Sequence, residues 1–119
     1  MNTLTLIGNL TADPELRAYE SGTAYLSFTL AVNDRIPTMQ NGTRTFKERT
    51  DFLRVNVPGP QAINCNKYLQ KGSKIGIVGS VRSYSVGEGD DRRTELVIHA
   101  DRVEFLAKIK TADTEAAPE

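Results

Sequence analysis

The stretch LTLIGNLTADPELR at residues 4–17, followed after a short turn by TAYLSFTLAVN at residues 23–33, decides the fold class. Gly8 interrupts the first apolar run, as expected where a strongly bent strand needs a residue without a Cβ atom. Asp13-Pro14 and Ser21-Gly22 mark two turns before the second stretch. Apolar and polar residues alternate strictly in that stretch, which is typical of a strand with one buried face. A bent strand followed by a long alternating strand is how small closed β-barrels begin.

The rest of the chain completes an all-β pattern with one helix. We predict five strands, at residues 2–10, 23–33, 50–57, 74–82 and 94–106, and one helix at residues 60–70. Pro60 stands near the first helical position, and Gly72 is a suitable C-terminal helix cap. A five-stranded barrel with one short helix between strands three and four has the OB architecture. The sequence therefore predicts an OB-fold domain at residues 1–107, followed by a short disordered acidic tail at residues 108–119.

The alternation also assigns side chains to the two faces of the barrel. In the strand at 50–57 the residues expected inside are Leu53, Val55 and Val57, and those expected outside are Phe52, Arg54 and Asn56. The residues expected inside from the last strand are Leu96, Ile98 and Ala100. The phase of that strand then changes across Asp101-Arg102, which indicates a β-bulge.

The composition limits the class of protein. A chain of 119 residues forms one domain that buries a core without disulfides or metal ions. Its single cysteine, Cys65, excludes an internal disulfide framework and fits a reducing compartment. No stretch approaches the roughly 20 apolar residues of a membrane span, and the N-terminus has no signal-peptide pattern. We expect a cytoplasmic protein, associated with the nucleoid, that has no membrane contact.

Catalytic residues are scarce in this sequence. With one histidine and one cysteine, it has almost no material for a Ser-His-Asp or Cys-His arrangement. His99 lies inside a predicted strand and is expected to be structural, and Cys65 shares a helix face with Ala62 and Leu69. No cysteine or histidine pair has metal-ligand spacing. The sequence therefore predicts a protein that is not an enzyme and takes no cofactor or metal.

The net charge is zero, with fifteen basic and fifteen acidic residues, but the bases are unevenly distributed. Between Arg35 and Arg54 lie five bases, against Glu48 and Asp51 only, and most of them belong to the segment 34–49, which, like 83–93 with its two arginines, is predicted as a long loop. A local patch can bind phosphate even on a neutral molecule, because fields are screened beyond about 8–10 Å. Loops of this length are usually functional.

Binding of a single nucleic-acid strand needs aromatic platforms for the bases and cations for the phosphates. An OB barrel offers this surface on the outer face of strands two and three and on the neighbouring loops. Phe52 stands on the polar side of its strand, two residues from an arginine, which is unusual in a plain sheet. The residues predicted to contact DNA are Tyr25, Arg35, Arg44, Phe46, Lys47, Arg49, Phe52, Arg54, Asn56, Arg82, Tyr84, Arg92 and Arg93.

Several motifs in order resemble the bacterial single-stranded DNA-binding proteins over about residues 2–107. They are G-N-L-x-x-D-P-E-x-R at 8–17, SGTAYLSFTLAVN at 21–33, TDFLRV at 50–55, KYLQKGS at 67–73 and TELVIHADRVEFL at 94–106. The resemblance implies an OB fold, usually in a homotetramer, that wraps single-stranded DNA without sequence preference. It also implies work in DNA replication, recombination and repair.

The resemblance carries over unevenly to single residues. The aromatic residue of the family's T-D/E-aromatic motif is Phe52 here, whereas three other familiar aromatic positions fall on Ile36, Pro58 and Val86. The chain has no tryptophan, so Phe46 and Tyr84 would have to stack in their place. The family usually ends in an acidic tip that recruits replication and repair proteins. This sequence ends in Ala-Ala-Pro-Glu, so it does not itself predict such recruitment.

Two further expectations concern assembly and the competing interpretations. The predicted first strand presents an outward row of uncharged residues, which suits contact with a second copy of the chain. The row consists of Thr3, Thr5, Ile7 and Asn9.

The first alternative to DNA binding is an OB-fold protein-interaction module of primosome-accessory type, which the low aromatic content favours slightly. The second is a small hydrolase, which the scarcity of catalytic residues disfavours.

Overall fold

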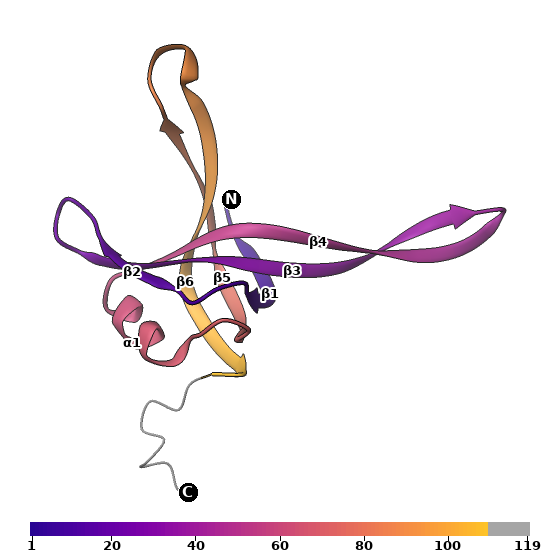
Figure 1. The fold of residues 1–119 in the computed structure, drawn as a ribbon, viewed down its shortest axis with the longest axis horizontal. Helices are drawn as coiled ribbons and strands as arrows, with labels where there is room; N and C mark the ends of the chain where they lie inside the picture. The colour runs from indigo at the N-terminus through magenta and orange to yellow at the C-terminus, as the bar shows by residue number, and fades with distance from the viewer. Residues whose placement is uncertain (110–119) are drawn as a thin grey trace, which may run out of the picture.

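The strands of the described residues form one sheet that closes on itself. The computed structural model describes residues 1–109 of the chain. The elements in chain order are β1 (Leu4–Leu10), β2 (Glu15–Ala18), β3 (Ala24–Gln40), β4 (Thr43–Pro58), α1 (Pro60–Tyr68), β5 (Lys74–Val86), a 3₁₀ turn (Gly89–Asp91) and β6 (Arg93–Ala107). The strand order is β1-β5-β6-β4-β3-β2, and β1 also pairs with β3. That last pairing returns the sheet to its first strand, so the predicted five-stranded barrel is confirmed (Figure 1).

A sixth strand, β2, was not predicted. It pairs with β3 alone, with Arg17 opposite Tyr25 and Glu15 opposite Ser27. All four of its residues are exposed, so it carries no alternation of buried and exposed positions that a sequence pattern could reveal. The helix lies between β4 and β5, where one helix was expected.

Gly8 permits the bend that closes the barrel. Up to Asn9 strand β1 pairs with β5, and at Asn9 and Leu10 it pairs with β3. A Cβ atom on Gly8 would stand 2.5 Å from the carbonyl oxygen of Ala31 on β3, which is closer than atoms approach. The expectation that this position needs a glycine is confirmed.

The predicted bulge in the last strand is also present. Val78 of β5 pairs with Arg102, whereas the next residue, Gly79, pairs with Ala100, so Asp101 has no partner in the ladder. At this point the two backbones come very close. A Cβ atom on Gly79 would stand 2.0 Å from the carbonyl oxygen of His99.

The inward faces of the strands and one face of α1 make the core. The buried apolar residues are Leu10, Leu26, Phe28, Leu30, Val55, Val57, Ala62, Cys65, Leu69, Ile75, Ile77, Ile98 and Ala100. Leu96 was expected among them, and that expectation is wrong, because its side chain is 66% exposed. Strand β6 meets β4 only from Ile98 onward, so Leu96 lies beyond the end of the barrel, where no layer covers it.

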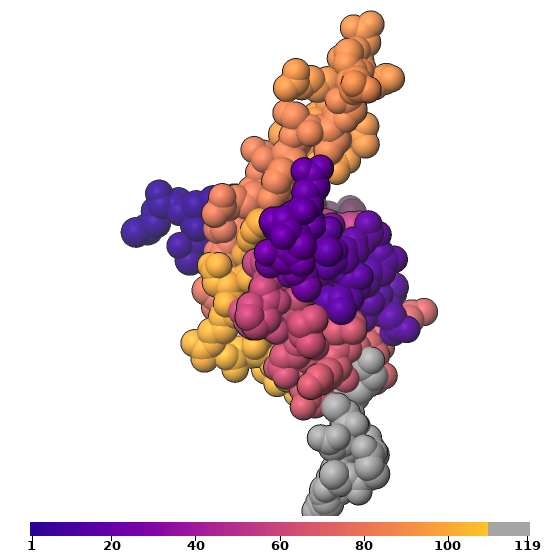
Figure 2. All heavy atoms as spheres, turned by 90° about the vertical axis from the view of Figure 1, so that its left-hand side faces the viewer, coloured from indigo at the N-terminus to yellow at the C-terminus, as the bar shows by residue number. Residues whose placement is uncertain are grey.

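The two segments predicted as long loops are instead strands. Residues 34–40 of β3 pair without interruption with residues 43–49 of β4, around a turn at Asn41-Gly42. Both turn residues have positive φ, 51° and 79°, as tight hairpin turns require. Residues 83–86 of β5 likewise pair with residues 93–96 of β6. Both hairpins project from the barrel as arms (Figure 1), and Figure 2 shows the β5–β6 arm standing away from the body of the molecule.

The helix is shorter than predicted. It ends at Tyr68, and Leu69 caps it in an extended conformation by donating its N–H to the carbonyl of Cys65. Gly72 is therefore not the helix cap. It adopts φ 89° in the turn before β5, where its N–H donates to the carbonyl of Leu10. The predicted tail at 108–119 lies, from residue 110 onward, outside the described residues.

Candidate nucleic-acid interface

Four of the predicted site residues meet in one groove on the outer face of the barrel. In the pairing of β3 with β4, Ala31 stands opposite Phe52, Thr29 opposite Arg54, Ser27 opposite Asn56 and Tyr25 opposite Pro58. The groove encloses about 620 Å³, and its lining residues are Tyr25, Phe52, Leu53, Arg54, Asn56, Glu95, Leu96 and Val97. The last three come from β6, just before Ile98 and His99, the two residues that pair in parallel with β4. The groove therefore lies where the two arms leave the barrel.

Phe52 is open to solvent in this groove. Its side chain is 66% exposed, so no other part of the described chain covers it. The prediction that Val55 and Val57 lie inside while Phe52 and Arg54 lie outside is confirmed. An exposed phenylalanine beside an arginine can stack on an unpaired base while the cation meets the adjacent phosphate.

Most aromatic residues of the chain gather on or against this outer face. The chain has eight, four tyrosines and four phenylalanines. Three of them serve the core, Phe28 as a buried strand residue and Tyr68 with Phe105 as a packed pair with ring centroids 5.6 Å apart. The other five are Tyr19, Tyr25, Phe46, Phe52 and Tyr84. Ring faces that could stack on bases are thus concentrated on one side of the molecule.

Tyr19 joins this surface through Tyr25. The two rings stack with centroids 4.2 Å apart at an angle of 22°. Burial raises the pKa of Tyr19, and the neighbouring Tyr84 and Tyr25 raise it further. Its hydroxyl is buried without a hydrogen-bond partner among the described residues. No sequence pattern marked Tyr19, because its position depends on how the turn after β2 folds back on β3.

The β3–β4 arm divides the predicted basic cluster between its two faces. Side chains alternate along a strand, so Arg35, Arg44 and Phe46 lie on the face that carries Phe52. The guanidinium of Arg35 stands over the ring of Phe46, 4.6 Å from its centroid. By the same alternation, Lys47 and Arg49 lie on the opposite face.

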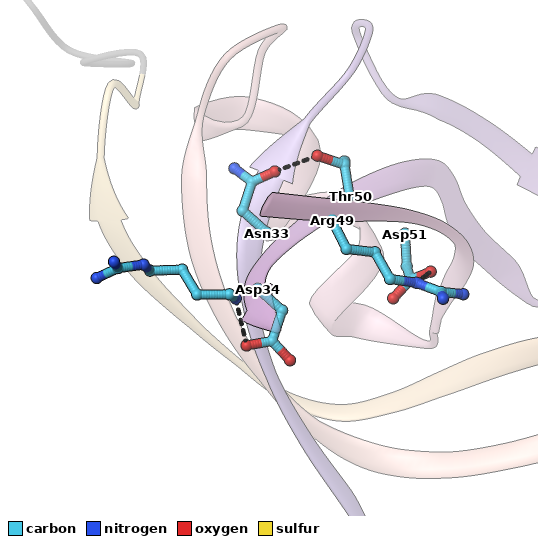
Figure 3. A network of polar contacts seen from close by, with 6 residues as sticks. Asn33, Asp34, Arg49, Thr50 and Asp51 are labelled. Atoms are coloured by element: carbon cyan, nitrogen blue, oxygen red, sulfur yellow. Dashed lines mark hydrogen bonds and ion pairs between the residues drawn. The ribbon is translucent and has the colours of Figure 1, made fainter. Parts of the chain in front are cut away.

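Figure 3 shows this division at the base of the arm. Thr50 donates a hydrogen bond to the amide oxygen of Asn33 over 2.6 Å, on the Phe52 face. The guanidinium of Arg49 reaches the carboxylate of Asp51 over 3.1 Å on the other face. Residues 34–49 therefore present their cations on two faces, because the pleat of a strand, unlike a loop, separates neighbouring side chains.

The β5–β6 arm brings three predicted residues to the groove side. Arg82 pairs with Val97 and Tyr84 with Glu95, and Arg93 pairs with Val86. The hydroxyl of Tyr84 lies 2.7 Å from Nε2 of His99. Burial lowers the pKa of His99, and Arg82 lowers it further, whereas Asp101 raises it. Arg92 stands apart, at the end of the 3₁₀ turn Gly89–Asp91.

Strand β2 adds an ion pair at the edge of the same face. Glu15 accepts hydrogen bonds from the guanidinium of Arg17. This arginine and, more weakly, Arg54 hold the pKa of Glu15 below its ordinary value. A hollow of about 150 Å³ is lined by both arginines, Glu15 and Ser27, among others. Arg17 was noticed only as part of a family motif, because its place beside Tyr25 depends on the unpredicted pairing of β2 with β3.

The described residues offer little for catalysis or metal binding. No group of three or more histidine, cysteine, aspartate or glutamate residues in residues 1–109 could hold a metal ion. Burial raises the pKa of the Cys65 thiol to about 11, so this thiol stays protonated and unreactive. No helix in the described part of the chain is long and apolar enough to cross a membrane.

The family model and the relatives that match this chain are those of single-strand binding proteins. A family model described as the single-strand binding protein family matches residues 1–106. Relatives from Staphylococcus aureus strains MRSA252 and Mu50, named single-stranded DNA-binding protein and single-stranded DNA-binding protein 1, are 41% and 43% identical to this chain. Each alignment covers 97% of this chain and 71% of the relative.

Two solved structures share the fold. A deletion mutant of the single-stranded DNA binding protein from Thermus aquaticus is 29% identical with a TM-score of 0.77, over 90% of this chain and 51% of that one. The chain thus spans about half the length of the Thermus protein. A Plasmodium falciparum SSB solved in complex with ssDNA also has a TM-score of 0.77, over 90% of this chain and 96% of that one. At 22% identity, this second likeness concerns the fold alone.

Proposed function

Because this chain belongs to the single-strand binding protein family, we propose that it binds single-stranded DNA and protects it during replication, recombination and repair. The binding tolerates any sequence, since stacking uses the flat face that every base has. The protein acts by sequestering the strand and catalyses no reaction. Its site of action is the cytoplasm, at the nucleoid.

The gathering of aromatic residues on one outer face carries this proposal. Tyr25 and Phe52 line a groove with Arg54 and Asn56. Phe46 extends the same face along the β3–β4 arm, under the guanidinium of Arg35. Rings that alternate with cations suit a strand whose bases are unpaired and whose backbone is anionic. Duplex DNA hides its base faces, so it would meet only the cations.

The DNA contacts fall into three groups by position. The groove contributes Tyr25, Phe52, Arg54 and Asn56. The groove-facing sides of the arms contribute Arg35, Arg44, Phe46, Arg82, Tyr84 and Arg93. The third group is peripheral and would contact DNA only if the DNA strand wraps around an arm. It consists of Lys47, Arg49 and Arg92. Arg17 of β2 joins the first group because it stands opposite Tyr25.

The working form is a homo-oligomer, most simply a tetramer, of an OB-fold domain at residues 1–107. One OB fold covers on the order of 4–16 nucleotides, so several linked barrels protect DNA better than one. Support comes from the outer side of β1, where Ile7 is 55% exposed and Val78, the strand partner of Thr5, is exposed as well. An exposed apolar patch of this kind suits contact with a second copy.

The alternative of a protein-interaction module is not favoured, because the relatives found are named for binding single-stranded DNA.

The direct test is a titration of the protein with a fluorescent oligonucleotide and with a duplex of equal length at two salt concentrations. We expect tighter binding of the single strand, with a log-log salt slope of roughly −0.7 for each phosphate neutralised. Equal affinity for both forms would contradict the proposal.

A further inference from the structure

Glu95 is the acidic residue in the lining of the groove, in which Arg54 is the cation. An acid on a surface that meets phosphates is unexpected, because it repels the backbone of the ligand. The position of the Glu95 carboxylate, and its oxygen to which no described residue donates, indicate which group of a DNA ligand it could bind.

The strand pairing places Glu95 on the side that carries Phe52. Strands β4 and β6 run parallel, with Asn56 opposite His99. Side chains alternate, so Glu95 and His99 share a face with Phe52 and Asn56. Glu95 also stands opposite Tyr84 in the β5–β6 arm. The carboxylate thus lines the same groove as the exposed ring of Phe52.

One oxygen of this carboxylate is engaged and the other is open. Nε of Arg93 donates to Oε2 over 3.2 Å, and a second nitrogen of the same guanidinium lies 3.2 Å from the same oxygen. The side chain is 49% exposed. No residue of the described range 1–109 donates to Oε1, which is left as an acceptor in the groove lining, while Arg93 pairs with Oε2.

A carboxylate can only accept hydrogen bonds, so it distinguishes bases by their donors. Cytosine, adenine and guanine carry an exocyclic amino group, whereas thymine and uracil present the O4 carbonyl oxygen where cytosine has its amino group and donate only from N3–H, so the discrimination acts at the position of that amino group. We propose that Glu95 accepts a hydrogen bond from the exocyclic amino group of the base that stacks on Phe52. The groove then favours cytosine over thymine or uracil at this one position. This inference rests on the proposed function and adds a bias to an otherwise sequence-tolerant site.

Another role for Glu95 makes a different prediction. If the carboxylate served only to hold Arg93 or to repel phosphate, replacing it with an amide would change the affinity for every base by the same factor. A base-reading role changes the affinities unequally. The ratio of two affinities, rather than either one alone, therefore decides between the two roles.

The test compares short oligo-dC and oligo-dU of equal length at pH 8, where cytosine N3 is unprotonated. Uracil differs from cytosine in the groups that pair and lacks the methyl group of thymine. We expect the unmodified protein to prefer oligo-dC, and Glu95→Gln to reduce that preference about fivefold, the value of about one ordinary hydrogen bond. The matched control is Glu104→Gln, which removes the carboxylate of the similar pair Arg102–Glu104 outside the groove and should leave the ratio unchanged.

Two results would overturn the inference while leaving the proposed function intact. One is equal binding of oligo-dC and oligo-dU by the unmodified protein. The other is a Glu95→Gln variant, folded by circular dichroism, whose two affinities shift by the same factor. Failure of the unmodified protein to bind any oligonucleotide would instead overturn the proposed function, and this inference with it.

Discussion

The ring of Tyr19 stacks on the ring of Tyr25, with centroids 4.2 Å apart and planes inclined by 22°. Tyr25 lines the groove, whereas Tyr19 is not among its lining residues. Tyr19 therefore acts on the groove through Tyr25, as a positioning residue. An aromatic pair of this kind is worth about 0.5–1.5 kcal/mol beyond the area it buries.

Two substitutions at Tyr19 distinguish the contribution of its ring from the contribution of its hydroxyl group. Tyr19→Ala should weaken binding of single-stranded DNA by about 0.5–1.5 kcal/mol, because Tyr25 loses the ring that orients it. Tyr19→Phe keeps the stack and removes a buried hydroxyl that has no partner among the described residues, so it should retain full affinity and stability. Oligonucleotide titrations and thermal melts measure both. An equal loss of affinity in the two variants would show that the stack has no positioning role.

The pH dependence of stability should report on His99. Its pKa is lowered in the folded protein, mainly by burial and then by Arg82, from an ordinary value of 6.5. Below pH 6.5 the unfolded chain therefore binds a proton that the folded protein does not yet bind, so the free energy of unfolding falls as the pH drops toward the folded pKa. The imidazole signals of the chain's single histidine give the pKa directly by NMR. A midpoint at or above 6.5 would contradict this account.

Two glycines on β5, Gly79 and Gly76, allow a controlled test of how closely the backbones approach where the barrel closes. A Cβ atom on Gly79 would meet backbone at 2.0 Å, whereas one on Gly76 would find its nearest neighbours at 3.8 Å. Gly79→Ala should therefore lower the free energy of unfolding by about 1–3 kcal/mol or more, as overpacking does. Gly76→Ala should change it little. Denaturant melts of both variants check this, and equal effects would refute the close approach at the bulge.

The outer side of β1 should be the assembly surface. Ile7→Lys places a charge on the apolar patch and should split the oligomer, which would weaken binding to long oligonucleotides more than to short ones. Ile63→Lys on α1, another exposed isoleucine, is the control. Light scattering measures the particle mass. A monomer for the unmodified protein at micromolar concentration would rule out the assembly and leave DNA binding open.

The barrel could be predicted because burial imposes a pattern on the sequence. Gly8 and the phase change at Asp101-Arg102 marked the bend and the bulge correctly, since each breaks the alternation of a half-buried strand. The arms and β2 were missed for the opposite reason. Their residues are mostly exposed, so no alternation of buried positions distinguishes them from charged loops. Leu96 continues the inward pattern past the end of the barrel, which the sequence does not mark.

The centre of the candidate site was predictable, and its surroundings were not. Phe52 was noticed because an aromatic residue on the polar side of a strand needs an explanation. Tyr19, Arg17 and Glu95 come from segments that approach the groove only through tertiary pairing, so no local pattern reveals them. Lys47 and Arg49 were assigned to the same surface because a loop has no fixed faces, whereas a strand does.

The most direct test of the central claim measures affinity and stability together on Phe52→Ala. We expect a loss of about 1–3 kcal/mol in binding single-stranded DNA with an unchanged melting temperature, because an exposed ring stacks on a base and supports nothing else. Ile63→Ala, which removes an exposed apolar side chain from α1, should change neither quantity. A lower melting temperature for Phe52→Ala, with unaltered affinity per folded molecule, would contradict the claim that this face binds DNA by base stacking.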